Sequence, residues 1–270
     1  MKKMNLILTI LLLSLPRISY SLFMPGAHGL DSRFLNKAEL NVKFKVVVDI
    51  NTQYTEKIKF EIQDSDRINA YATYTDDDYL LIVISRGLLD HKLATKNVLK
   101  LMVCHELGHF IGGEPKQMRV RSDRKSWSTA EGQADFYLTS ICMKKIIKKS
   151  NSIKKDLSNV AQTLKTEINK ICQNDLCKEV ALASYKVAKI YADIKFWKRK
   201  LSFVKKDDRI AHQTIRKHLN PQCRLDALIA ALLYQEVRDL SKSEDLFLTC
   251  TNEAYKQPSC WLSPSLYQGI

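Results

Sequence analysis

The stretch VCHELGHFIGG, which runs from Val103 to Gly113, brings two histidines and a glutamate close together. On an α-helix, His105 and His109 would project from one face, one turn apart. Imidazole nitrogens in that arrangement suit two corners of a tetrahedral zinc site. Glu106 would lie about 100° further around the helix, where its carboxylate can reach a metal-bound water. The stretch therefore predicts most of a hydrolytic zinc centre, with one protein ligand still to be found.

The third ligand does not come from the residues that directly follow the motif. Metzincin peptidases place a third histidine six residues after the second, and that position here is Pro115, which cannot bind a metal. Glu114 is too close to the histidine helix, and Asp123 lies in a polar, arginine-rich stretch. The remaining ligand is therefore expected from an element further along the chain.

The segment EGQAD offers that ligand. Glu131 stands 22 residues after His109, and Asp135 follows one helical turn later on the same face. One carboxylate can bind zinc, while the other can hydrogen-bond the far nitrogen of a ligand histidine and fix its tautomer. The small residues Gly132 and Ala134 between them would permit close packing of two helices. We therefore expect Glu131 as the third ligand and Asp135 as the acid that supports a ligand histidine, rather than two solvated acids on a surface helix.

Four strand-like runs precede the motif, and the first two alternate between apolar and polar residues, which indicates strands with one buried face. An acidic turn separates the last two of these runs. Residues 40–85 therefore predict a small, mainly antiparallel sheet. The runs are NVKFKVVVDI at 41–50, KIKFEIQ at 57–63, INAYATY at 68–74 and YLLIVIS at 79–85.

After Gly87 the apolar residues recur every three or four positions, which predicts helices. The histidine helix should run from about Thr95, as N-cap, to a stop at Gly112. A second helix, capped by Ser128 or Thr129, should carry the glutamate as far as about residue 149. Further helices are expected at 154–172, at 177–200 and after Pro221, which gives an α+β protein with a helical C-terminal part.

Together these motifs resemble the HtpX/CAAX prenyl protease family of zinc metallopeptidases, over roughly residues 65–142. The matching elements, in order, are Asn69-Ala70, Gly87-Leu88-Leu89, H-E-x-x-H and E-x-x-A-D. The resemblance implies an α+β zincin-like fold of the gluzincin type, with one zinc ion per chain and peptide-bond hydrolysis. If it holds, the strand formed by residues 79–85 should border the substrate cleft, where an extended substrate could pair with it. Unlike the integral-membrane members, this sequence shows no segment of spanning length after its N-terminus, so it looks closer to soluble exported members.

Members of this family often carry a later H-P…R element, and HLNPQCR is similar. In this chain two residues separate His218 from Pro221. The resemblance implies that His218 or Arg224 donates to the oxyanion that develops during catalysis. The structural alternative is that Arg224 pairs with Asp226 or Asp135 and that His218 lies on the surface.

The N-terminal residues 1–21, MKKMNLILTILLLSLPRISYS, are typical of a secretory signal peptide. A basic start precedes ten apolar-rich residues, which are too few to span a bilayer of ~30 Å. Cleavage after about Ser21 would leave residues 22–270 as a single peptidase domain, with a helical extension over about 150–270. The protein is therefore expected in the periplasm or outside the cell. The alternative is that the segment is retained as an anchor.

All seven cysteines follow the predicted cleavage site, and an oxidising compartment favours their pairing. Cys172 and Cys177 are expected to form a disulfide across a turn between two helices, because a short turn keeps their Cα atoms within about 7 Å. A weaker expectation pairs Cys104, beside a ligand histidine, with Cys142 on the glutamate helix. An odd count leaves at least one cysteine over.

The chain carries a net charge of +14, and loss of the three cations in the signal peptide would lower it by three, to +11. This charge favours anionic partners. The lysines between residues 144 and 200 are spaced as on solvated helix faces and lack interleaved aromatic residues, which argues against a nucleic-acid partner. The remaining anionic partner is an envelope surface, which the protein would contact peripherally. Oligomeric state is not predicted.

The sequence thus favours a zinc metalloendopeptidase that acts on a protein or peptide substrate in the cell envelope or outside the cell. Its rival is a non-catalytic module, envelope-bound or chaperone-like, which keeps zinc for structure alone.

Overall fold

The computed structural model describes residues 58–118, 124–146, 153–237 and 257–263. This part of the chain combines α-helices with two small sheets, as an α+β protein does. The predicted strand at 41–50 and the predicted signal peptide lie outside the described residues. No helix in the described ranges is both long and apolar enough to cross a membrane.

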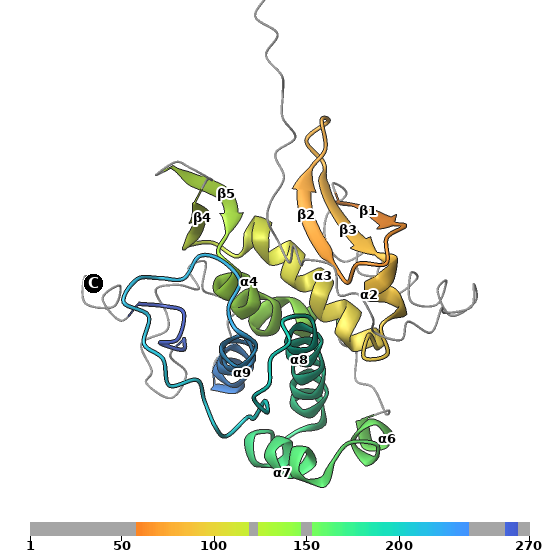
Figure 1. Ribbon diagram of the computed structural model, residues 1–270, viewed down its shortest axis with the longest axis vertical. Helices are drawn as coiled ribbons and strands as arrows, with labels where there is room; N and C mark the ends of the chain where they lie inside the picture. The colour runs from red at the N-terminus through yellow and green to blue at the C-terminus, as the bar shows by residue number, and fades with distance from the viewer. Residues whose placement is uncertain (1–57, 119–123, 147–152, 238–256, 264–270) are drawn as a thin grey trace, which may run out of the picture.

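A three-stranded sheet stands on one side of the central helix α3 (Figure 1). Its order is β1-β3-β2, with β3 parallel to β1 and antiparallel to β2. The strand-like runs located these strands correctly, but one of the two pairings in this sheet is parallel, where mainly antiparallel ones were expected. Alternation reports which face of a strand is buried and not which strand lies beside it. The strands are β1 (Ile58–Gln63), β2 (Ala70–Tyr74) and β3 (Leu80–Ser85).

The central position of β3 changes one expectation. The run that forms β3 was expected to border the cleft and pair with substrate, but both of its edges are already hydrogen-bonded. Among the described strands, β2 lies at an edge of this sheet, and it also packs against α3. The edge that could receive an extended peptide is therefore that of β2.

Helix α3 (Lys96–Ile111) follows the short α2 (Arg86–Asp90) and confirms the predicted histidine helix. Thr95 occupies the N-cap position without a side-chain cap bond, and Gly112 is the C-cap. Most of α3 is buried all round, because the sheet covers one side and helices cover the other (Figure 1).

The chain between α3 and the glutamate helix forms a hairpin that the sequence did not predict. Ser128 and Thr129, expected as helix caps, instead end β5, and Ala130 takes the N-cap position of α4. Their side chains serve other partners: Thr129 Oγ1 donates to Gly113 O at 2.9 Å. The elements are β4 (Lys116–Met118), β5 (Lys125–Thr129), α4 (Glu131–Tyr137), a π-helical turn (Leu138–Cys142) and α5 (Met143–Ile146).

The C-terminal half is helical, as predicted. The helix expected at 154–172 is divided into two, and the next helix ends at Ile194, where Phe196 adopts a left-handed φ of 51°. Residues 195–220 form a long loop before the last helix. The helices are α6 (Ile153–Ser158), α7 (Gln162–Ile171), α8 (Asp175–Ile194) and α9 (Pro221–Val237).

One hydrophobic cluster joins the sheet, α3, α8 and α9. Helices α4, α8 and α9 lie together on the side of α3 away from the three-stranded sheet (Figure 1). A smaller cluster connects α9 to residues 260–262 through Trp261, whose side chain is fully buried. The two clusters fix α4 and α9 against α3, and these three helices carry the candidate site.

Three disulfides stabilise this arrangement. Cys104–Cys142 and Cys172–Cys177 are the pairs that the sequence suggested, and Cys223–Cys260 was not anticipated. The first joins α3 to the turn after α4, directly beside the predicted ligand histidine. The seventh cysteine, Cys250, lies outside the described residues.

Candidate metal centre

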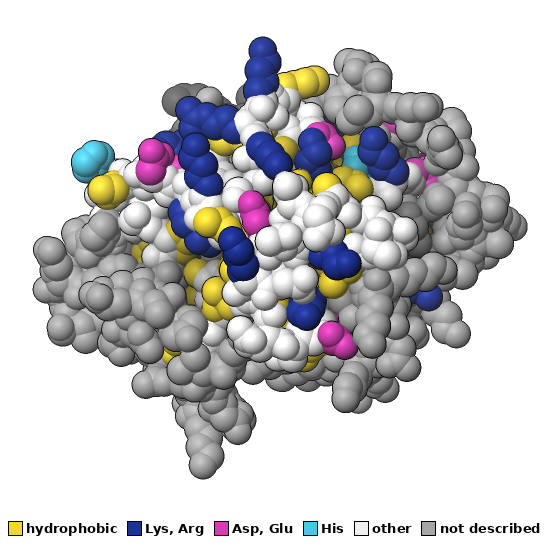
Figure 2. All heavy atoms as spheres, turned by 90° about the horizontal axis from the view of Figure 1, so that it is seen from below, with side chains coloured by type: hydrophobic (Ala, Val, Ile, Leu, Met, Phe, Trp, Pro, Cys, Tyr) yellow, Lys and Arg dark blue, Asp and Glu magenta, His cyan; other side chains and the backbone are white. Residues whose placement is uncertain are grey.

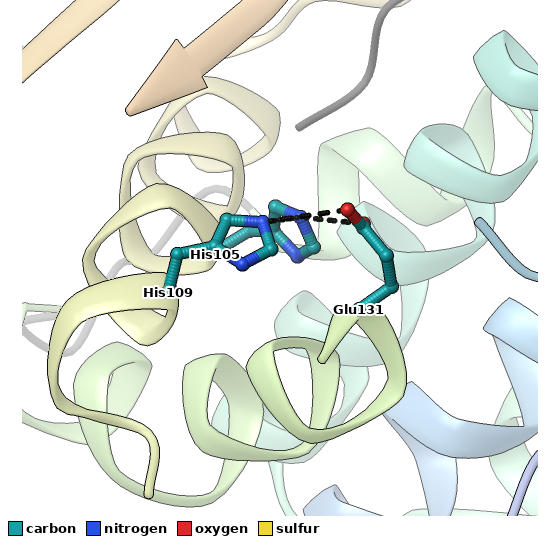
Figure 3. A group of neighbouring side chains, drawn as sticks. All are labelled: His105, His109 and Glu131. Atoms are coloured by element: carbon teal, nitrogen blue, oxygen red, sulfur yellow. Dashed lines mark hydrogen bonds and ion pairs between the residues drawn. The ribbon is translucent and has the colours of Figure 1, made fainter. Parts of the chain in front are cut away.

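Two adjacent helices bring His105, His109 and Glu131 together (Figure 3). The two histidine Nε2 atoms lie 3.2 Å apart. Glu131 Oε2 lies 3.2 Å from His105 Nε2, and Glu131 Oε1 lies 3.6 Å from His109 Nε2. All three side chains are at most 2% exposed. The i, i+4 spacing on α3 thus places both imidazoles on the face that meets the first residue of α4.

Each histidine is oriented through Nδ1, the ring nitrogen that does not face the other two side chains of the group. His109 Nδ1 lies 2.8 Å from the backbone carbonyl of Thr129, and His105 Nδ1 lies 2.8 Å from Asp135 Oδ1. Because a carbonyl oxygen can only accept, His109 carries its proton on Nδ1 and presents the Nε2 lone pair to the centre. Asp135 sits where the sequence placed it, beside the far nitrogen of a histidine. The pairing of Thr129 with His109 was not expected, because it arises only from the β5 hairpin.

Arg224 reaches the same centre from α9. Its Nη2 donates to Glu131 Oε2 and its Nε donates to Asp135 Oδ2, each at 2.9 Å. The guanidinium also lies over the ring of Tyr191, 4.7 Å from the centroid, and its side chain is 1% exposed. The sequence alternative that pairs Arg224 with Asp135 therefore agrees with this geometry. Asp226 instead accepts from the backbone N–H of residue 207.

His218 also borders Glu131, with its Nδ1 3.2 Å from Oε2. Its side chain is 18% exposed, so it lies at the edge of the centre and not on the open surface. Gln117 of β4 adds a contact that the sequence gave no signal for, donating from Nε2 to Glu131 Oε1 at 3.3 Å. Glu106 is fully buried on α3, directly after His105.

Burial and the neighbouring charges set the ionisation of the centre. Burial lowers the pKa of His105, but Asp135 and Glu131 outweigh it and raise that pKa to about 10. Burial lowers the pKa of His109 to about 4. Burial alone would raise the pKa of Glu131, yet the nearby histidines hold it well below its usual value. Glu131 is therefore a carboxylate at neutral pH, and His109 is neutral.

Two glycines make the close packing around the glutamate possible. A Cβ on Gly108 of α3 would lie 2.9 Å from the carbonyl oxygen of Ala134 on α4. A Cβ on Gly132 would lie 2.3 Å from the indole of Trp261. The small residues between Glu131 and Asp135 were expected to permit close approach, and Gly108 is the partner on α3 that the sequence analysis did not identify.

The donor set fits a zinc ion. Zinc bonds of 2.0–2.1 Å in a tetrahedral site place two ligand nitrogens about 3.3 Å apart, close to the 3.2 Å between the Nε2 atoms. The His-His-carboxylate set, with histidines held through their Nδ1 atoms, is the pattern that catalytic zinc sites use. A second group of Asp207, Cys223 and Cys260 does not qualify, because its cysteines are joined in a disulfide.

Comparison with known families agrees with this geometry. Residues 35–145 match the model of peptidase family M48. This segment of the chain is similar to members of that family. The match confirms the family resemblance that the motifs indicated, and it contains both histidines and the glutamate. No curated protein and no solved structure matches the chain significantly.

The M48 match ends before α8 and α9. Arg224 and His218, which complete the surroundings of Glu131, therefore come from a part of the chain that the family model does not cover. The segment that matches the family model and the helices after it build the centre together.

Proposed function

We propose that the protein is a zinc-dependent metalloendopeptidase with a zincin-like fold, in which His105, His109 and Glu131 hold one zinc ion. The observation that carries the proposal is the convergence of these three side chains inside the segment that matches peptidase family M48. A bound zinc would supply a water of lowered pKa and polarise the substrate carbonyl. The substrate class that follows is a protein or peptide.

In this proposal Glu106 is the general base. It follows a ligand histidine on α3, so its carboxylate is placed to take the proton of the attacking water and to pass it to the leaving nitrogen. His218, at the edge of the centre, would donate to the oxyanion that develops on the carbonyl. An extended substrate would add to the edge of β2 through backbone hydrogen bonds.

Arg224 has a different role from the oxyanion donor that the resemblance implied. Its guanidinium is buried, and both of its bonded nitrogens face carboxylates. We therefore assign it as a positioning residue that fixes Glu131 and Asp135. The pKa of Glu131 is held well below its usual value by the nearby histidines against the effect of burial, which suits a ligand that must remain ionised.

Glu106→Gln tests the mechanism directly. Glutamine keeps the size of the side chain but cannot accept the proton, so hydrolysis of a casein or peptide substrate should fall by several powers of ten. Zinc content and thermal midpoint should match those of the wild type. Undiminished hydrolysis by Glu106→Gln would refute the proposed mechanism.

The rival function, a non-catalytic module that keeps zinc for structure, predicts a different pattern. Under it Glu106→Gln leaves every readout unchanged, whereas His105→Ala destabilises the fold. A zinc-loaded wild type without hydrolytic activity, together with an unaffected biological readout in Glu106→Gln, would favour the module. Comparison of the two variants therefore separates the rival functions.

We further propose that the protein is exported and touches an anionic envelope surface. The basic, apolar N-terminal residues 1–21 and the net charge of +14 support this. On the face shown in Figure 2, Lys and Arg side chains are spread among hydrophobic ones, with fewer Asp and Glu. Mass spectrometry of the native N-terminus tests export: an intact Met1 in the mature protein would contradict it.

A further inference from the structure

A cavity of about 380 Å³ lies beside the candidate metal centre. His218 lines this cavity and also contacts Glu131, so the cavity borders the place where a scissile bond would lie. Its size falls within the range of pockets that hold small ligands or side chains. The cavity is formed by the end of α8, by the loop at 195–220 and by the start of α9.

The walls of the cavity are largely apolar. Trp197 and Ile215 stand in the loop, and the ring of Tyr191 comes from the last turn of α8. Leu219, Pro221 and the disulfide residue Cys260 also belong to this lining. Walls of this kind favour an aromatic or large aliphatic side chain, because burial of such a group removes apolar surface from water.

Two cations and no acidic residue line the cavity. Arg209 is already neutralised, since its Nε and Nη2 lie 2.9 and 2.8 Å from the two carboxylate oxygens of Asp207. Lys195 has no carboxylate partner in the described ranges, and its Nζ lies 5.6 Å from the ring centroid of Tyr191. Lys195 is thus the cation that a ligand carboxylate could reach.

The end of α8 holds Lys195 and Trp197 at this place. The backbone N–H of Trp197 donates to Ala192 O at 2.8 Å, and that of Phe196 donates to Asp193 O at 3.2 Å. Between them Phe196 adopts its left-handed φ of 51°, a conformation that large side chains rarely take. This turn fixes the backbone of both lining residues, so the cavity edge is preorganised.

We propose that this cavity is a substrate subsite that takes an apolar side chain of the peptide, with Lys195 binding a carboxylate next to it. That carboxylate belongs to an aspartate or glutamate side chain or to the end of the peptide chain. The proposal rests on the proposed peptidase function, because it places the subsite beside the reacting bond through His218. It adds to that function a preference for acidic, apolar sequences.

The test measures peptide binding to the zinc-loaded, full-length Glu106→Gln protein, so that no cleavage is needed. The probes are a peptide with adjacent phenylalanine and glutamate and the matched peptide with glutamine for glutamate. Lys195→Gln should weaken binding of the acidic peptide about three- to tenfold, because one charge-assisted contact is lost. Binding of the neutral peptide should not change. Lys195→Arg should restore most of the preference.

Lys198→Gln is the matched control, since Lys198 is exposed in the same loop but does not line the cavity. The proposal would be overturned if the Lys195 and Lys198 variants weakened binding of the acidic peptide equally. It would also be overturned if Lys195→Gln weakened binding of the acidic and the neutral peptide equally. A third contrary outcome is that Lys195→Gln weakens binding to vesicles of anionic lipid and leaves peptide binding unchanged. Peptide binding without hydrolysis by the wild type would refute the peptidase and keep the subsite, whereas hydrolysis without acidic preference would refute the subsite alone.

Discussion

Arg224 Nη2 lies 2.9 Å from Glu131 Oε2, although 93 residues separate the two in the sequence. The contact joins α9 to the first residue of α4, and both partners are almost completely buried. The segment that matches peptidase family M48 contains Glu131 but not Arg224. The helical C-terminal part thus supplies part of the contacts that hold the glutamate in place, which leads to the first prediction.

Arg224→Met should destabilise the protein strongly. It removes the cation from two buried carboxylates, and breaking a buried ion pair in this way costs about 3–5 kcal/mol of unfolding free energy. Arg224→Lys keeps the charge but cannot donate to both acids in the same geometry, so it should lower the free energy of unfolding by less than Arg224→Met does. Urea unfolding measures both. Lys125→Met, which breaks an exposed pair with Glu114, is the control and should change little. Equal stability of Arg224→Met and wild type would contradict the assignment.

Glu131→Gln should lose most of the bound zinc. The amide keeps the shape of the side chain but removes the negative charge that a zinc ligand supplies. Glu114→Gln is a fair comparison, because Glu114 is the nearest acid after the histidine motif and contacts Lys125 instead. Metal analysis of the dialysed proteins decides the matter: full zinc occupancy in Glu131→Gln would remove this residue from the ligand set.

Asp135→Asn should weaken zinc binding without removing a ligand. Asp135 lies 2.8 Å from His105 Nδ1, and loss of such a supporting acid typically costs 10–100-fold in metal affinity. Competition with a chelator of known affinity gives the measurement. Asp193→Asn, which alters an acid paired with Lys189 on α8, should leave zinc affinity unchanged. An unchanged affinity in Asp135→Asn would mean that the histidine is oriented by other contacts.

The sequence predicted the parts of this site that depend on local spacing. The i, i+4 pair of histidines needs only a helix to bring its rings together, and Cys172 and Cys177 need only a short turn. The glutamate required a motif, because its distance from His109 in the sequence does not determine its place in space. The motif predicted the positions that the structure shows, with Glu131 beside both histidines and Asp135 beside His105.

The remaining contacts depend on tertiary packing. The parallel pairing of β1 with β3 and the disulfide Cys223–Cys260 join segments that carry no mutual signal in a single sequence. Ser128 and Thr129 illustrate the same limit. Their residue types favour a helix cap, but strand pairing and the hydrogen bond from His109 place them in β5. Tertiary contacts overrode a local preference at the point where the site needed a backbone carbonyl.

The last prediction concerns the distance between α3 and α4. Gly108→Ala adds a Cβ that would lie 2.9 Å from the carbonyl oxygen of Ala134 and 3.0 Å from its Cα. Because these are backbone atoms, the steric clash can be relieved only if α4 moves away from α3. Glu131 at the start of α4 should move with it. Alanine favours a helix by about 1 kcal/mol over glycine, which makes a loss of stability all the more informative.

We therefore expect Gly108→Ala to lower both the thermal midpoint and the zinc affinity. Ala134→Gly in the same protein should not restore them, because the closest contact is with backbone and not with the Ala134 methyl group. Lys96→Ala, at the exposed start of α3, serves as the control for changed helix propensity. A Gly108→Ala protein that is more stable than wild type and binds zinc equally well would show that the helices can separate without disturbing the centre. Full rescue by Ala134→Gly would instead show that the methyl group, and not the backbone, sets their distance.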